Sequence, residues 1–311
     1  MNRLPKLGAA APFAMVGIMS SGFLVSQLAT PHVEPLTFLL LRYAAVLVLM
    51  LALALAARAA WPRGRQLLHV AVSGTGIHAG YLGGMWLAVA GGMPSSVVAL
   101  VTNLQPVLTG IALAAVGARV SARAATGLVI GFGGVALVVA ARLSTDGVTA
   151  SGIGLAVLAL LSVTAGTLYQ KALCPAFDLR TGQVVQSAAC IAVTAPFAIT
   201  SESFHVEWTV TVASALMWAV GVNTVAGMSI LYGMLRRGSA ERVTSYFYLT
   251  PAVTTVLAAV LFGEPIAPVT ALGIVVTMAG VVLVTARPAG ERPGGAPSGQ
   301  DAQTAAVPVE A

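Results

Sequence analysis

Charged side chains are scarce in this chain of 311 residues. Asp, Glu, Lys and Arg together make up 8% of the sequence, whereas a soluble globular domain carries about 25%. Hydrophobic residues reach 58%, and the mean hydropathy is +0.91. This composition excludes an ordinary soluble domain and predicts a protein embedded in a lipid bilayer.

Cysteines are few, and catalytic motifs are lacking. The only two cysteines, Cys174 and Cys190, give neither a disulfide framework nor a metal-site spacing. The sequence has no paired carboxylates, no His-Glu-x-x-His zinc motif, no Gly-x-Ser-x-Gly elbow and no phosphate-binding loop. These absences argue against an enzyme, against a bound cofactor or metal, and against ATP hydrolysis by this chain.

Long apolar runs recur from end to end. A hydrocarbon core about 30 Å thick needs about 20 apolar residues per helical crossing, and continuous runs favour helices over barrel strands. We therefore predict an all-α membrane protein with ten transmembrane helices, near residues 8–29, 36–57, 67–90, 95–117, 124–141, 151–171, 182–200, 209–233, 240–262 and 267–286.

An internal repeat relates residues 94–142 to residues 239–287. At an offset of 145 residues, Pro106 pairs with Pro251. After a one-residue slip, spaced glycines also match. An internal repeat constrains the whole fold. This one predicts two copies of a five-helix unit.

The basic residues sort by membrane side. With ten crossings and a cytoplasmic N-terminus, fourteen of the sixteen Lys and Arg residues lie on the cytoplasmic side, as the positive-inside rule requires. The connection after the first copy carries Arg119 and Arg123, but the equivalent connection after the second copy has no basic residue. The second unit is therefore predicted to be inverted, an arrangement found in many transporters.

Three segments follow from the repeat. We expect a first repeat over 1–142, an inverted repeat over 150–287, and a disordered cytoplasmic tail over 288–311, which has little to bury. Both termini would be cytoplasmic, in the cytoplasmic membrane of the cell. An alternative stays open for the first 29 residues, which could be a cleaved signal peptide.

Polar groups at bilayer depth are costly unless they face protein or a water-filled cavity. His78 and Asn223 are separated by the repeat offset, so they would face each other across a central cavity. The alternative is that these side chains bond to neighbouring helices. The predicted substrate-binding residues are Ser21, His78, Tyr81, Asn103, Gln105, Asn223, Tyr246 and Tyr248.

Arg42 is the only cation predicted inside the membrane. We favour a structural role, in which it snorkels outward or pairs with Glu34, over binding of a substrate carboxylate. His78 is the only group near the midplane that titrates near neutral pH. It is the first candidate carrier if protons drive transport, with facilitated diffusion and exchange equally open.

Prolines and glycines predict local shape. Pro106 and Pro251 would lie in the middle of helices, as bends with a structural or gating role or as sites where a freed carbonyl contacts the substrate. Gly76, Gly80 and Gly84 form a stripe that predicts close helix packing. Trp86 is expected near the outer membrane surface, as an interfacial anchor or a platform for substrate stacking.

The chain resembles the ten-helix, EamA-type branch of the drug/metabolite transporter superfamily. The resemblance lies in Ser21-Gly22-Phe23, Arg42, Gly80-Tyr81, Ala88, Leu104 to Pro106, Leu249 to Pro251 and Gly263-Glu264. It implies secondary transport, usually export, of amino acids or other small metabolites. One departure is Gly117-Ala118-Arg119, where such repeats often end in Gly-Glu.

These observations predict a transporter in which two inverted halves alternately expose a central cavity to either side. Its first, third, fourth, sixth, eighth and ninth helices would line the cavity. The expected partners are a small-molecule substrate and the lipid bilayer, with protons an open possibility and nucleic acid excluded, in a monomer or a homodimer. The alternatives are a non-transporting scaffold or receptor and a lipid-modifying enzyme.

Overall fold

The computed structural model describes residues 11–115, 122–143, 148–174, 176–227, 229–230, 249–264 and 266–285. Helices and their connections make up this part of the chain, together with one isolated antiparallel bridge between Val33 and Val206. The predicted all-α class is confirmed. The predicted tail, Tyr246, Tyr248 and the Gly117-Ala118-Arg119 motif lie outside the described residues.

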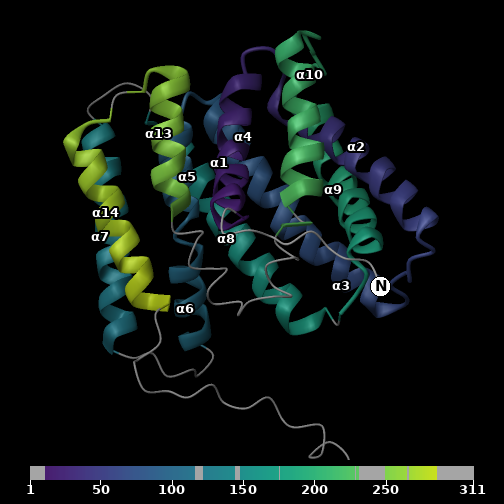
Figure 1. Ribbon diagram of the computed structural model, residues 1–311, viewed down its shortest axis with the longest axis horizontal. Coiled ribbons are helices and arrows are strands. Elements are labelled where there is room, and N and C mark those ends of the chain that lie inside the picture. Colours follow the sequence, from purple (N-terminus) through teal and green to yellow (C-terminus); the bar gives the residue numbers. More distant parts are fainter. Residues whose placement is uncertain are drawn as a thin grey trace, which may run out of the picture.

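Each of the ten predicted ranges contains helix (Figure 1). Two segments, η1 and η2, are π-helical and continue the α-helices on either side of them. In chain order the elements are α1 (Ala11–Ala29), α2 (Pro35–Ala56), α3 (Arg65–Gly74), η1 (Thr75–Gly80), α4 (Tyr81–Ala90), α5 (Ser95–Thr102), α6 (Gln105–Ala115), α7 (Ala122–Leu143), α8 (Ala150–Leu173), α9 (Leu179–Ser201), α10 (Val210–Met217), η2 (Trp218–Ala226), α13 (Thr250–Phe262) and α14 (Pro268–Thr285).

Several of these helices can cross a bilayer. Five segments are long and apolar enough by length and composition: α1, α2, Ser95–Ala112, α8 and α9. Four more are apolar but shorter, namely Ala125–Val138, Val210–Ala226, Thr250–Phe262 and Pro268–Leu283. The chain is therefore a multi-pass membrane protein, and the count of ten crossings stays a prediction.

Helix boundaries repeat at the offset found in the sequence. The starts of α6 and α13, at Gln105 and Thr250, are 145 residues apart, and so are the ends of α2 and α9, at Ala56 and Ser201. When the first repeat is shifted by 145 residues, η1 falls within η2. The repeat is thus present in local structure as well as in sequence.

The prediction that Pro106 lies in the middle of a helix is wrong. The helix breaks after α5, where Asn103 follows Thr102, and restarts at Gln105. Pro106 is therefore in the first turn of α6, and Pro251 is likewise in the first turn of α13. Proline is favoured there because its missing N–H would have no partner inside the helix.

Equivalent helices of the two repeats pack in antiparallel pairs. In the pair α7 and α14, a Cβ added at Gly280 would collide with the backbone of Gly131, and one at Gly134 would lie 2.7 Å from the Gly273 carbonyl oxygen. Residue numbers therefore rise along one helix as they fall along the other. Figure 1 shows these two helices side by side at one edge of the bundle.

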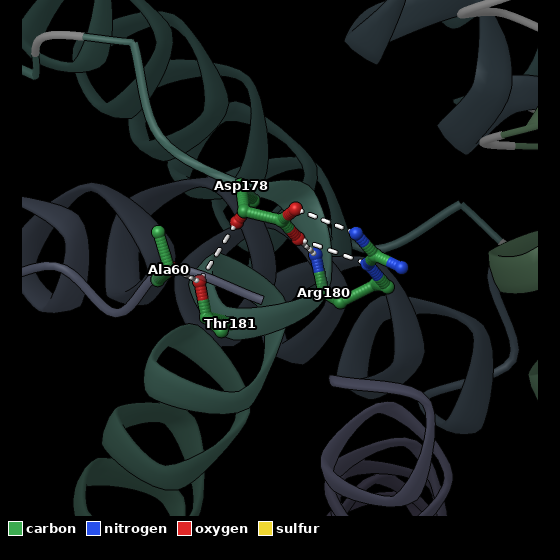
Figure 2. Close-up of polar contacts among 4 residues, drawn as sticks. All are labelled: Ala60, Asp178, Arg180 and Thr181. Atoms are coloured by element: carbon green, nitrogen blue, oxygen red, sulfur yellow. Dashed lines mark hydrogen bonds and ion pairs between the residues drawn. The ribbon is translucent and has the colours of Figure 1, made fainter. Parts of the chain in front are cut away.

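The equivalent helices α2 and α9 are also antiparallel. The Glu202 carboxylate at the end of α9 accepts a hydrogen bond from the Leu36 N–H at the start of α2, at 2.8 Å. Beyond the other end of α2, the Ala60 carbonyl accepts a hydrogen bond from the Thr181 hydroxyl at the start of α9, at 2.8 Å (Figure 2). Opposite ends of the two helices are thus fastened together.

The glycine stripe on the third crossing packs closely, as predicted. A Cβ at Gly76 would lie 2.9 Å from the Gly166 Cα, and one at Gly84 would lie 2.7 Å from the Leu155 carbonyl oxygen. Small residues therefore allow η1 and α4 to approach α8 backbone to backbone. This contact joins the first repeat to the second.

Trp86 has neither of its expected positions. Its side chain is completely buried and stacks on Phe38 of α2, with ring centroids 4.3 Å apart and an interplanar angle of 21°. Both the interfacial anchor and the substrate platform are therefore wrong. The ring instead fills the space where α2 and α4 meet.

A substitution at the α7–α14 contact tests this packing. We expect Gly280→Ala to lower the melting temperature of the detergent-purified protein by several degrees, because overpacking costs about 1–3 kcal/mol. Gly133→Ala, on the same helix pair, is the matched control, because its Cβ would meet nothing within 4 Å. Equal melting temperatures for the two variants would contradict the close contact.

Candidate functional site

A cavity of about 260 Å³ lies between the two repeats. Residues from α1, α2, η1 and α4 of the first repeat face residues from α8, α9 and η2 of the second. The lining residues are Met15, Met19, Gly22, Phe23, Arg42, Tyr43, Val46, Ile77, His78, Tyr81, Leu82, Met85, Val163, Gln183, Ser187, Cys190, Asn223, Thr224 and Gly227.

The structure brings three of the predicted substrate-binding residues to this cavity. His78 lies in η1, Tyr81 begins α4, and Asn223 lies in η2. Arg42, predicted as a structural or gating residue, also lines it. The two π-helical segments therefore place the equivalent residues His78 and Asn223 on one cavity, where their widened turns interrupt regular α-helical geometry.

The set of lining helices differs from the expected one. The second and seventh crossings, α2 and α9, contribute side chains, and α5 and α6 contribute none of the lining residues. On α9, Gln183 and Ser187 were not singled out from the sequence, and Cys190 was considered only for disulfide and metal-site spacing. Their spacing of four and three residues places them on one helix face. That pattern in an apolar helix is the signal that could have identified them.

Ser21 is not among the lining residues, but it contacts one of them, Asn223. Its hydroxyl is 2.7 Å from the Ile18 carbonyl and 3.1 Å from Asn223 Oδ1, and it accepts a hydrogen bond from Trp218 Nε1 at 2.8 Å. A hydroxyl has one proton, so it donates to Ile18 or to Asn223 at any moment. Ser21 thereby fastens α1 to η2 next to Asn223.

Asn103 and Gln105 are engaged away from the cavity. The Asn103 side chain donates to the Ala99 carbonyl at 2.7 Å, and Gln105 donates to the Thr167 hydroxyl at 3.2 Å. Neither is among the lining residues. These contacts agree with the alternative of bonds within and between helices, and the substrate-binding role of both residues stays a prediction.

The expected pairing of Arg42 with Glu34 is wrong. The Glu34 carboxylate accepts hydrogen bonds from the backbone N–H groups of Ser203 and His205, at 3.0 and 2.9 Å. Within the described ranges, no residue forms a hydrogen bond or an ion pair with the Arg42 guanidinium. A cationic side chain therefore faces the cavity without a partner from this part of the chain.

Carboxylates fasten the two repeats together at one end of the bundle. We call residues 32–37 and 202–207 the loop clasp. Glu202 accepts from the Leu36 and Thr37 N–H groups at 2.8 and 2.7 Å, so it caps the N-terminus of α2 from the second repeat. His32 and Glu207 are 3.0 Å apart. The Ser203 N–H lowers the pKa of Glu34 most, and the bond to His32 lowers that of Glu207.

The opposite end of α9 has its own capping group. The Asp178 carboxylate accepts hydrogen bonds from the backbone N–H and the guanidinium of Arg180, at 2.9 and 2.8 Å (Figure 2). The bond from the Arg180 side chain is the main cause that lowers the pKa of Asp178. Asp178 thus holds the start of α9 where Thr181 reaches Ala60.

The Gly-Glu pair of the second repeat has a structural role. Gly263 ends α13 with a positive φ of 69°, which favours glycine. The Glu264 carboxylate accepts from the Ser96 hydroxyl at 2.6 Å and from the Gln27 amide at 3.0 Å. The turn after α13 is thereby fastened to α5 and α1.

Two helical repeats surround a partly polar cavity in this multi-pass membrane protein. The family model of the EamA-like transporter family matches residues 6–140 and again residues 150–286. The chain belongs to this family. The resemblance drawn from the sequence motifs is confirmed.

Individual relatives agree with this assignment. The uncharacterized transporter YvbV of Bacillus subtilis (strain 168) is 25% identical over 205 residues, which are 63% of this chain and 64% of that protein. The chain thus matches just under two thirds of the relative's length. A protein of known crystal structure has a TM-score of 0.60 at 19% identity, over 88% of this chain and 96% of its own, a likeness of fold alone.

The loop clasp predicts a dependence of stability on pH. A carboxylate whose pKa is lowered in the folded protein stabilises it above the unfolded pKa, about 4.3 for Glu, and loses that contribution as pH falls through the folded value. Going from pH 6 to pH 3.5, we expect the melting temperature to fall less in Glu34→Gln than in the wild-type protein. An identical fall in both would show that Glu34 contributes nothing.

Proposed function

We propose that this chain is a secondary transporter that exports a small metabolite, an amino acid or a related compound, across the cytoplasmic membrane. The observation that carries the proposal is the cavity of about 260 Å³ lined by both repeats. The absence of a nucleotide-binding motif from the sequence favours a gradient as the energy source. Membership of the EamA-like transporter family supports the same function.

Alternating access is supported by the antiparallel pairing of equivalent helices. Two repeats related in this way have their two-fold axis in the membrane plane, so one packing can open to either face. The loop clasp and the Thr181–Ala60 contact lie at opposite ends of the α2–α9 pair, and each joins the two repeats. When the cavity opens toward one face of the membrane, either the loop clasp or the Thr181–Ala60 contact separates, and the other contact stays formed.

The size of the cavity favours a small solute. Pockets for drug-sized ligands measure about 300–1,000 Å³, and this cavity is smaller. Its apolar wall of methionine, leucine and phenylalanine side chains suits an aliphatic or aromatic body. A scaffold that binds no solute would have no need for a cavity shared between the two repeats.

Flux through reconstituted vesicles tests the function. Against a panel of amino acids and small metabolites, with and without a pH gradient, we expect uptake of at least one solute. His78→Ala and Asn223→Ala should reduce it severalfold to about tenfold, because each removes a polar contact worth about 1 kcal/mol. Ser214→Ala is the control, since its exposed hydroxyl bonds only to the Thr211 carbonyl among the described residues. Unchanged flux in both cavity variants would refute the site.

Cysteine labelling tests the proposed orientation, in which both termini are cytoplasmic. In a Cys174→Ser background, we expect Trp208→Cys to react with a membrane-impermeant maleimide on intact cells. Arg63→Cys should react only after the membrane is permeabilised. Both positions are exposed, and the other native thiol, Cys190, is buried. Labelling of Arg63→Cys from outside would invert the topology.

A further inference from the structure

We infer that the cavity recognises the carboxylate of a small, otherwise apolar solute, which pairs with the Arg42 guanidinium. This inference deepens the proposed function and rests on it, since it names the chemical class of the solute. It replaces the structural role that the sequence favoured for Arg42. The arguments concern the charge of the cavity, its other walls and the geometry of a guanidinium.

The charge balance of the cavity is one-sided. No Asp, Glu or Lys occurs among the described lining residues, so Arg42 is their one permanently charged side chain. The five described carboxylates lie outside the helical spans, at Glu34, Asp178, Glu202, Glu207 and Glu264, and the hydrogen bonds given above engage each of them. None is bonded to Arg42.

A guanidinium with no partner among the described residues is costly inside a membrane-spanning helix. Arg is not deprotonated in proteins, and a charge in a low-dielectric interior is tolerated when it pairs with an opposite charge or faces water. An anionic solute supplies the missing partner. Binding of an anion then removes the cost of the buried charge and also adds an ion pair. The charge of the solute is therefore the strongest basis for selectivity in this cavity.

The geometry favours a carboxylate over other anions. The planar guanidinium offers two parallel N–H donors that match the two oxygens of a carboxylate. A phosphate dianion would need a second cation or a set of free backbone N–H groups. The described lining residues include no other Arg or Lys, and His78 and Asn223 lie inside continuous helical segments whose N–H groups are used.

The remaining walls define the rest of the solute. Met15, Met19, Phe23 and Met85 offer apolar surface, and Asn223 offers a neutral amide. A free ammonium group would find neutral oxygens but no carboxylate among the described lining residues. The carboxylate is therefore the group that is required, and an α-amino group is dispensable.

Calorimetric titration of the purified protein in detergent tests this with three probes built on one skeleton. They are 4-methylpentanoate, its neutral isostere 4-methylpentanamide, and leucine. We expect the carboxylate to bind at least about tenfold more tightly than the amide, a difference of about 1.4 kcal/mol. Leucine should bind no more than severalfold more tightly than 4-methylpentanoate. Equal binding of carboxylate and amide, or binding of neither carboxylate, overturns the inference.

Variants locate the charge. Arg42→Gln should abolish the preference for 4-methylpentanoate over the amide. Arg42→Lys should keep part of this preference, because lysine retains the charge but lacks the two parallel N–H donors of the guanidinium. Arg65→Gln, at an exposed position at the start of α3, is the matched control and should behave as wild type. A preference that survives in folded Arg42→Gln protein overturns the assignment. The comparison of probes on wild-type protein stands even if that variant does not fold.

The experiments distinguish a failure of the proposed anion site from a failure of the proposed transport function. Carboxylate selectivity in detergent with no flux in vesicles would refute the proposed transport and leave the anion site intact. Flux that does not discriminate the carboxylate from the amide would refute the anion site and leave transport intact.

Discussion

The interior of a bilayer supplies neither hydrogen-bond partners for a peptide backbone nor solvation for a charge, and the arrangement of this protein follows from that. The described segments satisfy their backbone groups as helices, and their ion pairs lie at the ends of the bundle, where Glu207 meets His32 and Asp178 meets Arg180. Arg42 departs from this pattern because it lies within α2. Its side chain lines the cavity that the helices leave beside it, where a charge is less costly than in lipid.

Close approach between the two repeats depends on residues without bulk. Gly131, Gly134, Gly273 and Gly280 allow α7 and α14 to touch along their backbones, and Gly76 and Gly84 do the same against α8. Apolar side chains gain nothing by leaving lipid for another apolar surface, so helix association in membranes relies on such contacts and on hydrogen bonds. The carboxylates of Glu34 and Glu202 supply those bonds between the repeats.

Much of the fold could be predicted from the sequence, because the apolar composition and the internal repeat are each carried by many residues. The offset of 145 residues identified His78 and Asn223 as a pair, and both line the cavity. Features set by one or two local contacts were not accessible. The break before Pro106, the stacking of Trp86 on Phe38 and the capping of α2 by Glu202 depend on which segments meet in space. Gln183 and Ser187 were not predicted, because the family resemblance and the distribution of polar residues both pointed to other helices as the cavity lining.

The cavity is two-fold in its framework but not in its chemistry. At the repeat offset, the counterpart of Arg42 is Ser187, and both line the cavity. If the solute is an anion that pairs with Arg42, only the first repeat binds its charge, whichever face is open. On the proposed mechanism the solute therefore keeps one orientation relative to the membrane throughout the transport cycle. That orientation is set by the position of Arg42 on α2.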